Sequence, residues 1–188
     1  MMLIMRYPAG HKEEVRARIV NATARALCRD GLLGVSIPAL MKDAGLTHGG
    51  FYAHFDDRDE LVAEAVEAAA ARTGAEVFAE GVPLEDALAR YLSSEHLGAP
   101  DRGCVVAALG TEGAHASPSV RRAFAKAARG LLALVDGKLR PGKRAKEPSD
   151  EALRLTATMV GAVMLGRLVD DPVLAERMLK AARRSLPR

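Results

Sequence analysis

The sequence has no tryptophan, four phenylalanines, three tyrosines and only two cysteines in 188 residues. Neither Cys28 nor Cys104 lies in a Cys-x-x-Cys pair or in a Cys/His cluster with zinc-ligand spacing, so we expect no disulfide framework and no metal site. No apolar run approaches the roughly 18 residues that cross a bilayer, and residues 1–5 are shorter than the roughly 7 to 15 residues of a signal-peptide core. These absences favour a cytoplasmic protein with no membrane segment.

Sequence motifs of enzymes are also missing. The chain contains no Gly-rich phosphate-binding loop, no His-Glu-x-x-His motif and no nucleophile elbow. An enzymatic alternative would pair the thiol of Cys104 with His96 or His115 as its base. Neither the order of these residues nor a Gly-rich oxyanion element supports that pairing, so we expect no catalytic residues and no cofactor.

Alanine, leucine, arginine and glutamate dominate the chain, and the alternation of β-branched residues that marks strands is missing. The sequence therefore predicts an all-α fold. Ser36 is expected to cap the second helix, Asp56 and Asp57 to cap the long acidic helix, and Gly31 and Gly45 to end helices. Helices are expected at residues 12–30, 36–44, 47–54, 56–80, from 83 onward, and at 104–112, 118–139, 150–169 and 172–185, with a loop at 98–103.

Residues 36–54 have the arrangement of a helix-turn-helix: a short helix, a turn containing glycine, and a second very short helix for which Thr47 is the N-cap candidate. Such a helix on a buried scaffold enters the major groove of double-stranded DNA. The side chains of Thr47, His48, Tyr52 and His54 are polar hydrogen-bonding groups of the kind that contact bases and phosphates. These residues are therefore candidates for DNA contact.

Two pairs of residues in the second short helix call for different explanations. Gly49 and Gly50 each cost about 1 kcal/mol relative to alanine inside a helix, and they leave no side chain to hinder a close approach by DNA. Phe51 and Phe55 are expected to anchor the helix in the core, because so short a helix needs buried contacts to be stable. We assign the two phenylalanines no contact role.

The run AGLTHGGFYAHF at residues 44–55, together with Gly31, the segment 36–40, Arg58 and Leu61, resembles the DNA-binding domain of the TetR/AcrR family of transcriptional regulators. The similarity covers residues 12–62 without a gap. It implies a DNA-binding domain at residues 1–62, a linking helix to about residue 80, and a helical effector-binding and dimerisation domain at 63–188. It also implies a repressor that a small molecule releases from DNA, whereas the alternative is a DNA-organising helix-turn-helix protein without an effector.

The resemblance also implies roles for single residues. Thr47 would cap the recognition helix and contact DNA, Tyr52 and His54 would contact phosphates, and Arg58 would contact the DNA backbone from the fourth helix. Gly50 and Arg58 depart from the usual family pattern, which has a small hydroxyl residue or alanine and a lysine at these positions. Without the resemblance, Tyr52 would be interpreted as a half-buried packing residue and His54 as a surface histidine.

The segment 157–168 is apolar on nearly every side. The resemblance implies a homodimer built from the last two helices, and a two-fold dimer matches a palindromic operator; the alternative is a core helix of a monomer. A charge placed at Val163 or Gly166 is then expected to yield a monomer. Arg167, the only charge within this apolar segment, is expected to pair with a carboxylate or to face solvent.

The effector pocket is harder to locate from sequence. We expect it among Tyr91, Cys104, Phe124, Met159 and Met164, although aromatic and methionine side chains at helical spacing more often belong to the core. Cys104 follows Arg102 near a predicted helix N-terminus, which favours a reactive thiolate. The alternative is that Cys104 is a small buried hydrophobic residue.

Overall fold

The computed structural model describes residues 11–142 and 146–184, and within these ranges the chain is all-α and contains no strand, which confirms the predicted fold class. The elements are α1 (His11–Asp30), α2 (Ile37–Asp43), the 3₁₀ helix η1 (His48–Ala53), α3 (Arg58–Val77), α4 (Leu84–Tyr91), α5 (Ser94–Gly98), the 3₁₀ helix η2 (Pro100–Arg102), α6 (Val105–Ala114), α7 (Pro118–Leu139), α8 (Asp150–Leu168) and α9 (Pro172–Arg184).

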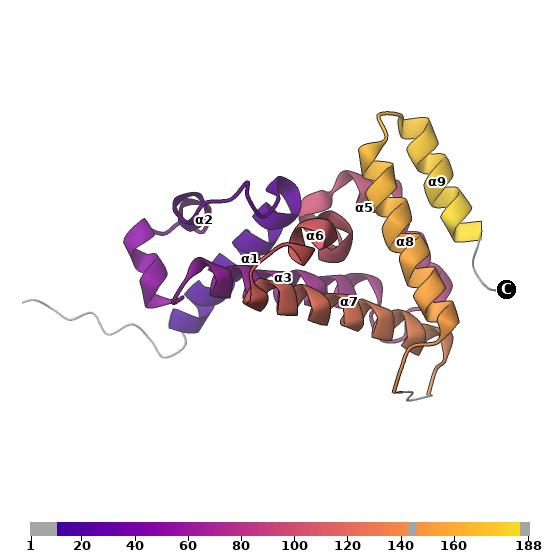
Figure 1. The fold of residues 1–188 in the computed structure, drawn as a ribbon, viewed down its shortest axis with the longest axis horizontal. Helices are drawn as coiled ribbons and strands as arrows, with labels where there is room; N and C mark the ends of the chain where they lie inside the picture. The colour runs from indigo at the N-terminus through magenta and orange to yellow at the C-terminus, as the bar shows by residue number, and fades with distance from the viewer. Residues whose placement is uncertain (1–10, 143–145, 185–188) are drawn as a thin grey trace, which may run out of the picture.

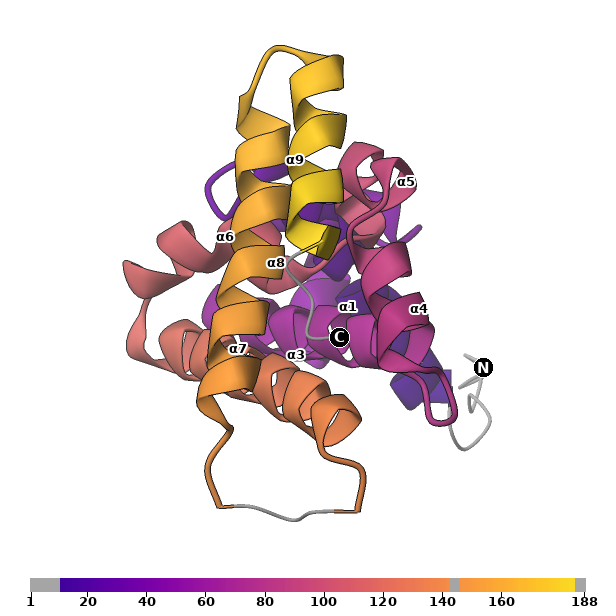
Figure 2. The same cartoon turned by 90° about the vertical axis from the view of Figure 1, so that its right-hand side faces the viewer.

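The molecule is elongated, with α1, α2 and η1 at one end and the antiparallel pair α8 and α9 at the other (Figure 1). Helices α3 and α7 run side by side between the two ends, and α6 packs against both α1 and α7. Turned by 90°, α8 and α9 stand in front of the rest of the body (Figure 2). The long helices α3 and α7 therefore join the N-terminal end to the body.

Two hydrophobic cores follow this division. The first joins the N-terminal helices to α3, α6 and α7, and includes Ile19, Leu61 and Leu109. The second joins α4, α7, α8 and α9 around Leu88 and Leu155. Because α6 contributes to the first core, the N-terminal end is packed on the body instead of being linked to it by α3 alone.

Four helix ends are set by local signals that the sequence contains. The Ser36 hydroxyl accepts the Ala39 N–H at 3.4 Å, and Asp57 accepts the Glu60 N–H at 2.8 Å. Gly31 and Gly45 adopt φ angles of +82° and +73°, a region that only glycine enters at little cost. These four expectations are confirmed.

Two local expectations were wrong. Thr47 occupies the N-cap position of η1 as expected, but its side chain makes no capping hydrogen bond. The reason is the 3₁₀ geometry, in which the Thr47 carbonyl itself accepts the Gly50 N–H at 3.0 Å and so satisfies the amide that a cap would bind. The segment 98–103 is not a simple loop either, because it contains the end of α5 and all of η2.

No helix among residues 11–142 and 146–184 is long and apolar enough to span a bilayer.

Candidate nucleic-acid interface and effector cavity

The helix η1 is anchored by two buried rings and presents a third ring to solvent. Phe51 and Phe55 are 0% and 2% exposed, and their rings stack with centroids 5.6 Å apart, so both are core residues as expected. Tyr52 is 67% exposed and meets the Phe51 ring edge-on at 5.1 Å. With this exposure, Tyr52 is not a half-buried packing residue.

The two glycines of η1 are not required by the packing of the chain itself. A methyl group added at Gly49 would meet no atom within 4 Å, and one added at Gly50 would make ordinary contacts with Met41 at 3.7 Å and Thr47 at 3.8 Å. Both φ angles lie outside the left-handed region that favours glycine. The free energy that Gly49 and Gly50 cost the helix relative to alanine is therefore not offset by any contact or backbone conformation of this chain.

Basic residues lie beside His54 at the end of η1. Burial lowers the pKa of His54, and the nearby charges of Lys12, Arg16 and His11 lower it further. The His54 Nδ1 atom is buried without a hydrogen-bond partner within the described part of the chain. An anion placed here would lie near Lys12 of α1, whereas the charge of Arg16 is already paired with Glu60 and Glu64.

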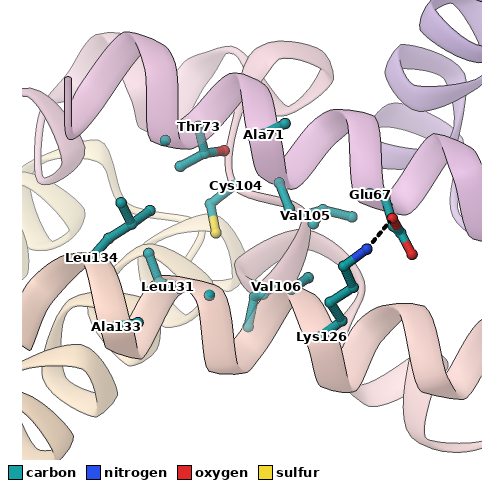
Figure 3. Close-up of a pocket in the computed structure, with 14 residues that line it drawn as sticks. Glu67, Ala71, Thr73, Cys104, Val105, Val106, Lys126, Leu131, Ala133 and Leu134 are labelled. Carbon is teal, nitrogen blue, oxygen red and sulfur yellow. Dashed lines mark hydrogen bonds and ion pairs between the residues drawn. The ribbon is translucent and has the colours of Figure 1, made fainter. Parts of the chain in front are cut away.

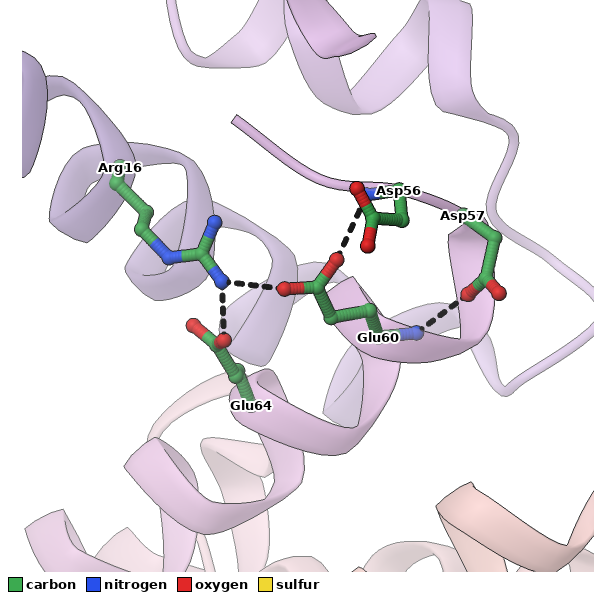
Figure 4. Close-up of polar contacts among 5 residues, drawn as sticks. All are labelled: Arg16, Asp56, Asp57, Glu60 and Glu64. Atoms are coloured by element: carbon green, nitrogen blue, oxygen red, sulfur yellow. Dashed lines mark hydrogen bonds and ion pairs between the residues drawn. The ribbon is translucent and has the colours of Figure 1, made fainter. Parts of the chain in front are cut away.

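Arg16 holds the start of α3 against α1 (Figure 4). Its guanidinium donates to Glu60 at 2.7 Å and to Glu64, and it covers the Phe55 ring at 4.2 Å from the ring centroid. Glu60 also accepts the Asp56 N–H at 2.7 Å, and this bond, followed by the bond from Arg16, lowers the pKa of Glu60. Sequence reasoning did not single out Arg16, because its partners lie more than 40 residues away.

The side chain of Arg58 binds the chain's own backbone. Its guanidinium donates to the carbonyl of Leu32 and, at 3.4 Å, to that of Val35, both in the segment between α1 and α2. Arg58 therefore positions this segment, and its expected contact with DNA stays a prediction. The Thr47 side chain is exposed, as contact with DNA requires, while the side chain of His48 lies outside the described part of the structure.

The same segment is tied to the body through Glu112, near the end of α6. The Leu32 N–H donates to the Glu112 carboxylate at 2.7 Å, across 80 residues of sequence. Gly31 makes room for this contact, because a methyl group there would lie 3.2 Å from a carboxylate oxygen. Leu32 is thus held by α3 through Arg58 and by α6 through Glu112, a link that sequence reasoning missed.

A cavity of about 580 Å³ lies between α3, α7 and the start of α6 (Figure 3). Its walls are lined by Glu67, Ala70, Ala71, Thr73, Gly74, Cys104, Val105, Val106, Lys126, Ala127, Gly130, Leu131, Ala133 and Leu134. The long helices face each other here largely through alanine and glycine, and the missing side-chain volume creates the space. At one end, Lys126 and Glu67 form an ion pair at 2.5 Å that joins α7 to α3.

Of the five residues expected in the effector pocket, only Cys104 lines this cavity. Tyr91 and Met159 are fully buried in the second core, and Phe124 packs against Gly113, where a methyl group would lie 2.5 Å from its ring. Met164 is 37% exposed and lines a separate apolar groove between α7 and α8. These large side chains fill space in the core or face outward, so they do not border the main cavity.

The contacts of His96 bear on the enzymatic alternative. His96 Nδ1 lies against the Tyr91 carbonyl, and Nε2 accepts the backbone N–H of Cys104 at 3.0 Å. The basic nitrogen is therefore occupied by an amide and is not available to deprotonate the Cys104 thiol. His115 follows the opposite end of α6 from Cys104, so it offers no base either. In the described residues, no three histidine, cysteine, aspartate or glutamate side chains gather as metal ligands.

Arg167 does not behave as expected. It neither pairs with a carboxylate nor extends into solvent, but donates to the carbonyls of Leu97 at 3.2 Å and His96 at 3.0 Å. Carbonyl oxygens at the end of the short helix α5 thus supply the acceptors for a partly buried guanidinium, and burial lowers the pKa of Arg167. Arg167 holds α5 against α8.

Helices α8 and α9 expose apolar side chains to solvent. The large ones are Leu153, Met164, Leu165, Leu168, Val173 and Leu174, with exposed fractions from 37% to 73%. Val163 is fully buried, and a methyl group at Gly166 would lie 3.0 Å from Leu97. The expectation that charges at Val163 or Gly166 would separate a dimer was therefore wrong, because these two residues face the core of their own chain.

The architecture defines a helix-turn-helix head carried on a helical body. Residues 19–65 match the family described as bacterial regulatory proteins of the tetR family, and residues 83–182 match the tetracyclin repressor-like C-terminal domain. The chain therefore belongs to the TetR family of transcriptional regulators.

Solved structures share the whole fold. E. coli NemR in its reduced form is 22% identical, covering 91% of this chain and 94% of its own, with a TM-score of 0.71. A TetR-family regulator from Cytophaga hutchinsonii is 16% identical, covering 95% and 96%, with a TM-score of 0.75. A TetR regulator from Chloroflexus aurantiacus is 26% identical, covering 92% and 94%, with a TM-score of 0.68. A search of curated proteins gives no significant match.

Proposed function

We propose that this TetR-family protein is a repressor that binds a palindromic operator as a homodimer and leaves the DNA when a small molecule occupies the cavity. The observation that carries the DNA contact is the face of η1. Gly49 and Gly50 leave open space beside the exposed Tyr52, and nothing in the chain itself requires either glycine. This open space beside His54, with Lys12 nearby on α1, suits the close approach of a phosphate backbone.

The apolar face of α8 and α9 supports the homodimer. Leu165 and Leu168 on α8 and Leu174 on α9 are 47%, 73% and 39% exposed, and contiguous exposed apolar surface is typical of subunit interfaces. A second copy of the chain would cover the same face of both subunits, as two-fold symmetry requires. Two recognition helices then meet two half-sites of a palindrome, about one helical turn apart.

The cavity favours an effector over the alternative of a DNA-organising protein without one. It is bordered by α3, which continues from the DNA-binding head, and by α6, whose far end contacts the head through Glu112. A ligand that spreads α3, α6 and α7 would therefore change how the head is held. A small molecule releases DNA in this way only if it prefers the state that binds DNA poorly.

The DNA contact is tested by selecting operator sequences from a random duplex library and measuring affinity by fluorescence anisotropy. Gly49→Leu should weaken binding at least tenfold because its side chain would occupy the space that the DNA needs. Gly137→Leu on α7 is the matched control, because a side chain there also meets no atom within 4 Å. Unchanged affinity of a folded Gly49→Leu protein would remove the main support for the proposal.

A further inference from the structure

The interior of the cavity offers no partner to an ionic group. Helix α6 contributes Val105 and Val106, the preceding residue contributes the thiol of Cys104, and α7 adds Leu131 and Leu134. The Thr73 hydroxyl, on α3, already donates to the carbonyl of Ala69 at 3.2 Å. Because burying a charge without a partner is costly, the walls favour an apolar molecule.

The charged groups of the cavity are confined to one end and neutralise each other. Lys126 and Glu67 meet at 2.5 Å, and their side chains are 68% and 45% exposed. The pair has no net charge, so it attracts neither an anion nor a cation strongly. A ligand carboxylate would have to replace Glu67 at Lys126, and it would then lie beside the displaced carboxylate.

We propose that the effector is an uncharged hydrophobic molecule, and that the Lys126–Glu67 pair sets this preference by disfavouring anionic amphiphiles. The inference depends on the proposed function only for the statement that the cavity is the effector site. The preference itself belongs to the cavity and is measurable without DNA. Removing one member of the pair should shift the preference in a direction given by the charge that remains.

The test uses two fluorescent probes of similar ring structure, the neutral N-phenyl-1-naphthylamine and the anionic 8-anilinonaphthalene-1-sulfonate, titrated into the full-length protein. The wild type should bind the neutral probe more tightly. Glu67→Gln frees Lys126 and should tighten binding of the anionic probe about fivefold, which corresponds to the ~1 kcal/mol upper range of an exposed ion pair. The double variant Glu67→Gln/Lys126→Gln should restore the preference for the neutral probe.

Two variants locate the probes. Gly130 lines the cavity, and a side chain there would meet no atom within 4 Å, so Gly130→Leu should fill the space and weaken binding of the neutral probe. Gly137→Leu, two turns further along α7, should not. Equal affinity of the wild type for both probes, no change with Glu67→Gln, or binding that is insensitive to Gly130→Leu would each overturn the inference.

DNA release is measured separately. A neutral probe that binds in the cavity with the expected preference but leaves the operator complex intact would contradict the proposed function and leave the charge preference standing. If anionic ligands bind the wild-type cavity as tightly as neutral ligands do and release DNA, this result would support the proposed function and refute the charge preference.

Discussion

The bond between Glu112 and Leu32 is a direct polar contact between the body and the DNA-binding head, and Glu112→Ala removes it. The bond is 2.7 Å long and joins a carboxylate to a backbone N–H. Hydrogen bonds to charged groups contribute about 1.5 to 3 kcal/mol, and the exposure of Glu112 places this one near the lower end. We therefore expect the free energy of unfolding to fall by about 1.5 kcal/mol in urea titrations at constant protein concentration.

The effect of Glu112→Ala on regulation should exceed its effect on stability. One end of α6 lines the cavity and the other holds the segment between α1 and α2, so losing the bond should reduce the amount by which a cavity ligand weakens DNA binding. Glu112→Gln keeps an acceptor oxygen and should retain part of the response. Thr111→Ala, at the neighbouring exposed position, is the control. A normal ligand response in the Glu112→Ala protein would refute this role of α6.

Three further outcomes are expected. Leu165→Glu should give a folded protein that sediments as a monomer and does not bind the operator, whereas Val163→Glu should impair folding. A dimeric Leu165→Glu protein would contradict the assigned interface. If a phosphate raises the pKa of His54, which is lowered in the free protein, then DNA affinity should rise as the pH falls below about 6.5, and His54→Gln should remove that dependence. Hydrogen bonds from Arg140 and then Ser149 lower the pKa of Asp136 to about 2. The contribution of Asp136 to stability should therefore be complete above the ordinary pKa of 3.8 and disappear as the pH falls through about 2. The difference in unfolding midpoint between Asp136→Asn and the wild type should shrink over that interval.

The parts of the fold that the sequence predicted depend on local chemistry. Ser36 and Asp57 accept amides three residues ahead, and the positive φ angles of Gly31 and Gly45 lie at helix ends. Such features act within one turn of backbone, so their signals survive in the sequence. The 3₁₀ geometry of η1 was not predictable in this way, because it is fixed by the burial of Phe51 and Phe55 against other helices.

Residues with distant partners were missed or make contacts that the sequence did not indicate. In the sequence, Arg16 is one of several basic residues of α1. Only the packing of α3 against α1 brings Glu60 and Glu64 into contact with it. From sequence alone Glu112 resembles any surface acid, because its partner Leu32 lies 80 residues away and comes close only in the folded protein. Arg58, expected at DNA because of the resemblance, donates to carbonyls that no pattern of side chains reveals.

Most of the residues expected in the effector pocket lie away from the cavity between α3 and α7. Tyr91, Phe124 and Met159 are large side chains that fill interior space, and their contact with an effector stays a prediction. The walls of a cavity are instead marked by missing volume. Ala127 and Gly130 lie three residues apart on one face of α7, and they oppose Ala70 and Gly74 on α3. The signal that could have located this cavity is a repeat of small residues at helical spacing on two helices that pack together. Only the pairing of α3 with α7 distinguishes such a repeat from ordinary close packing.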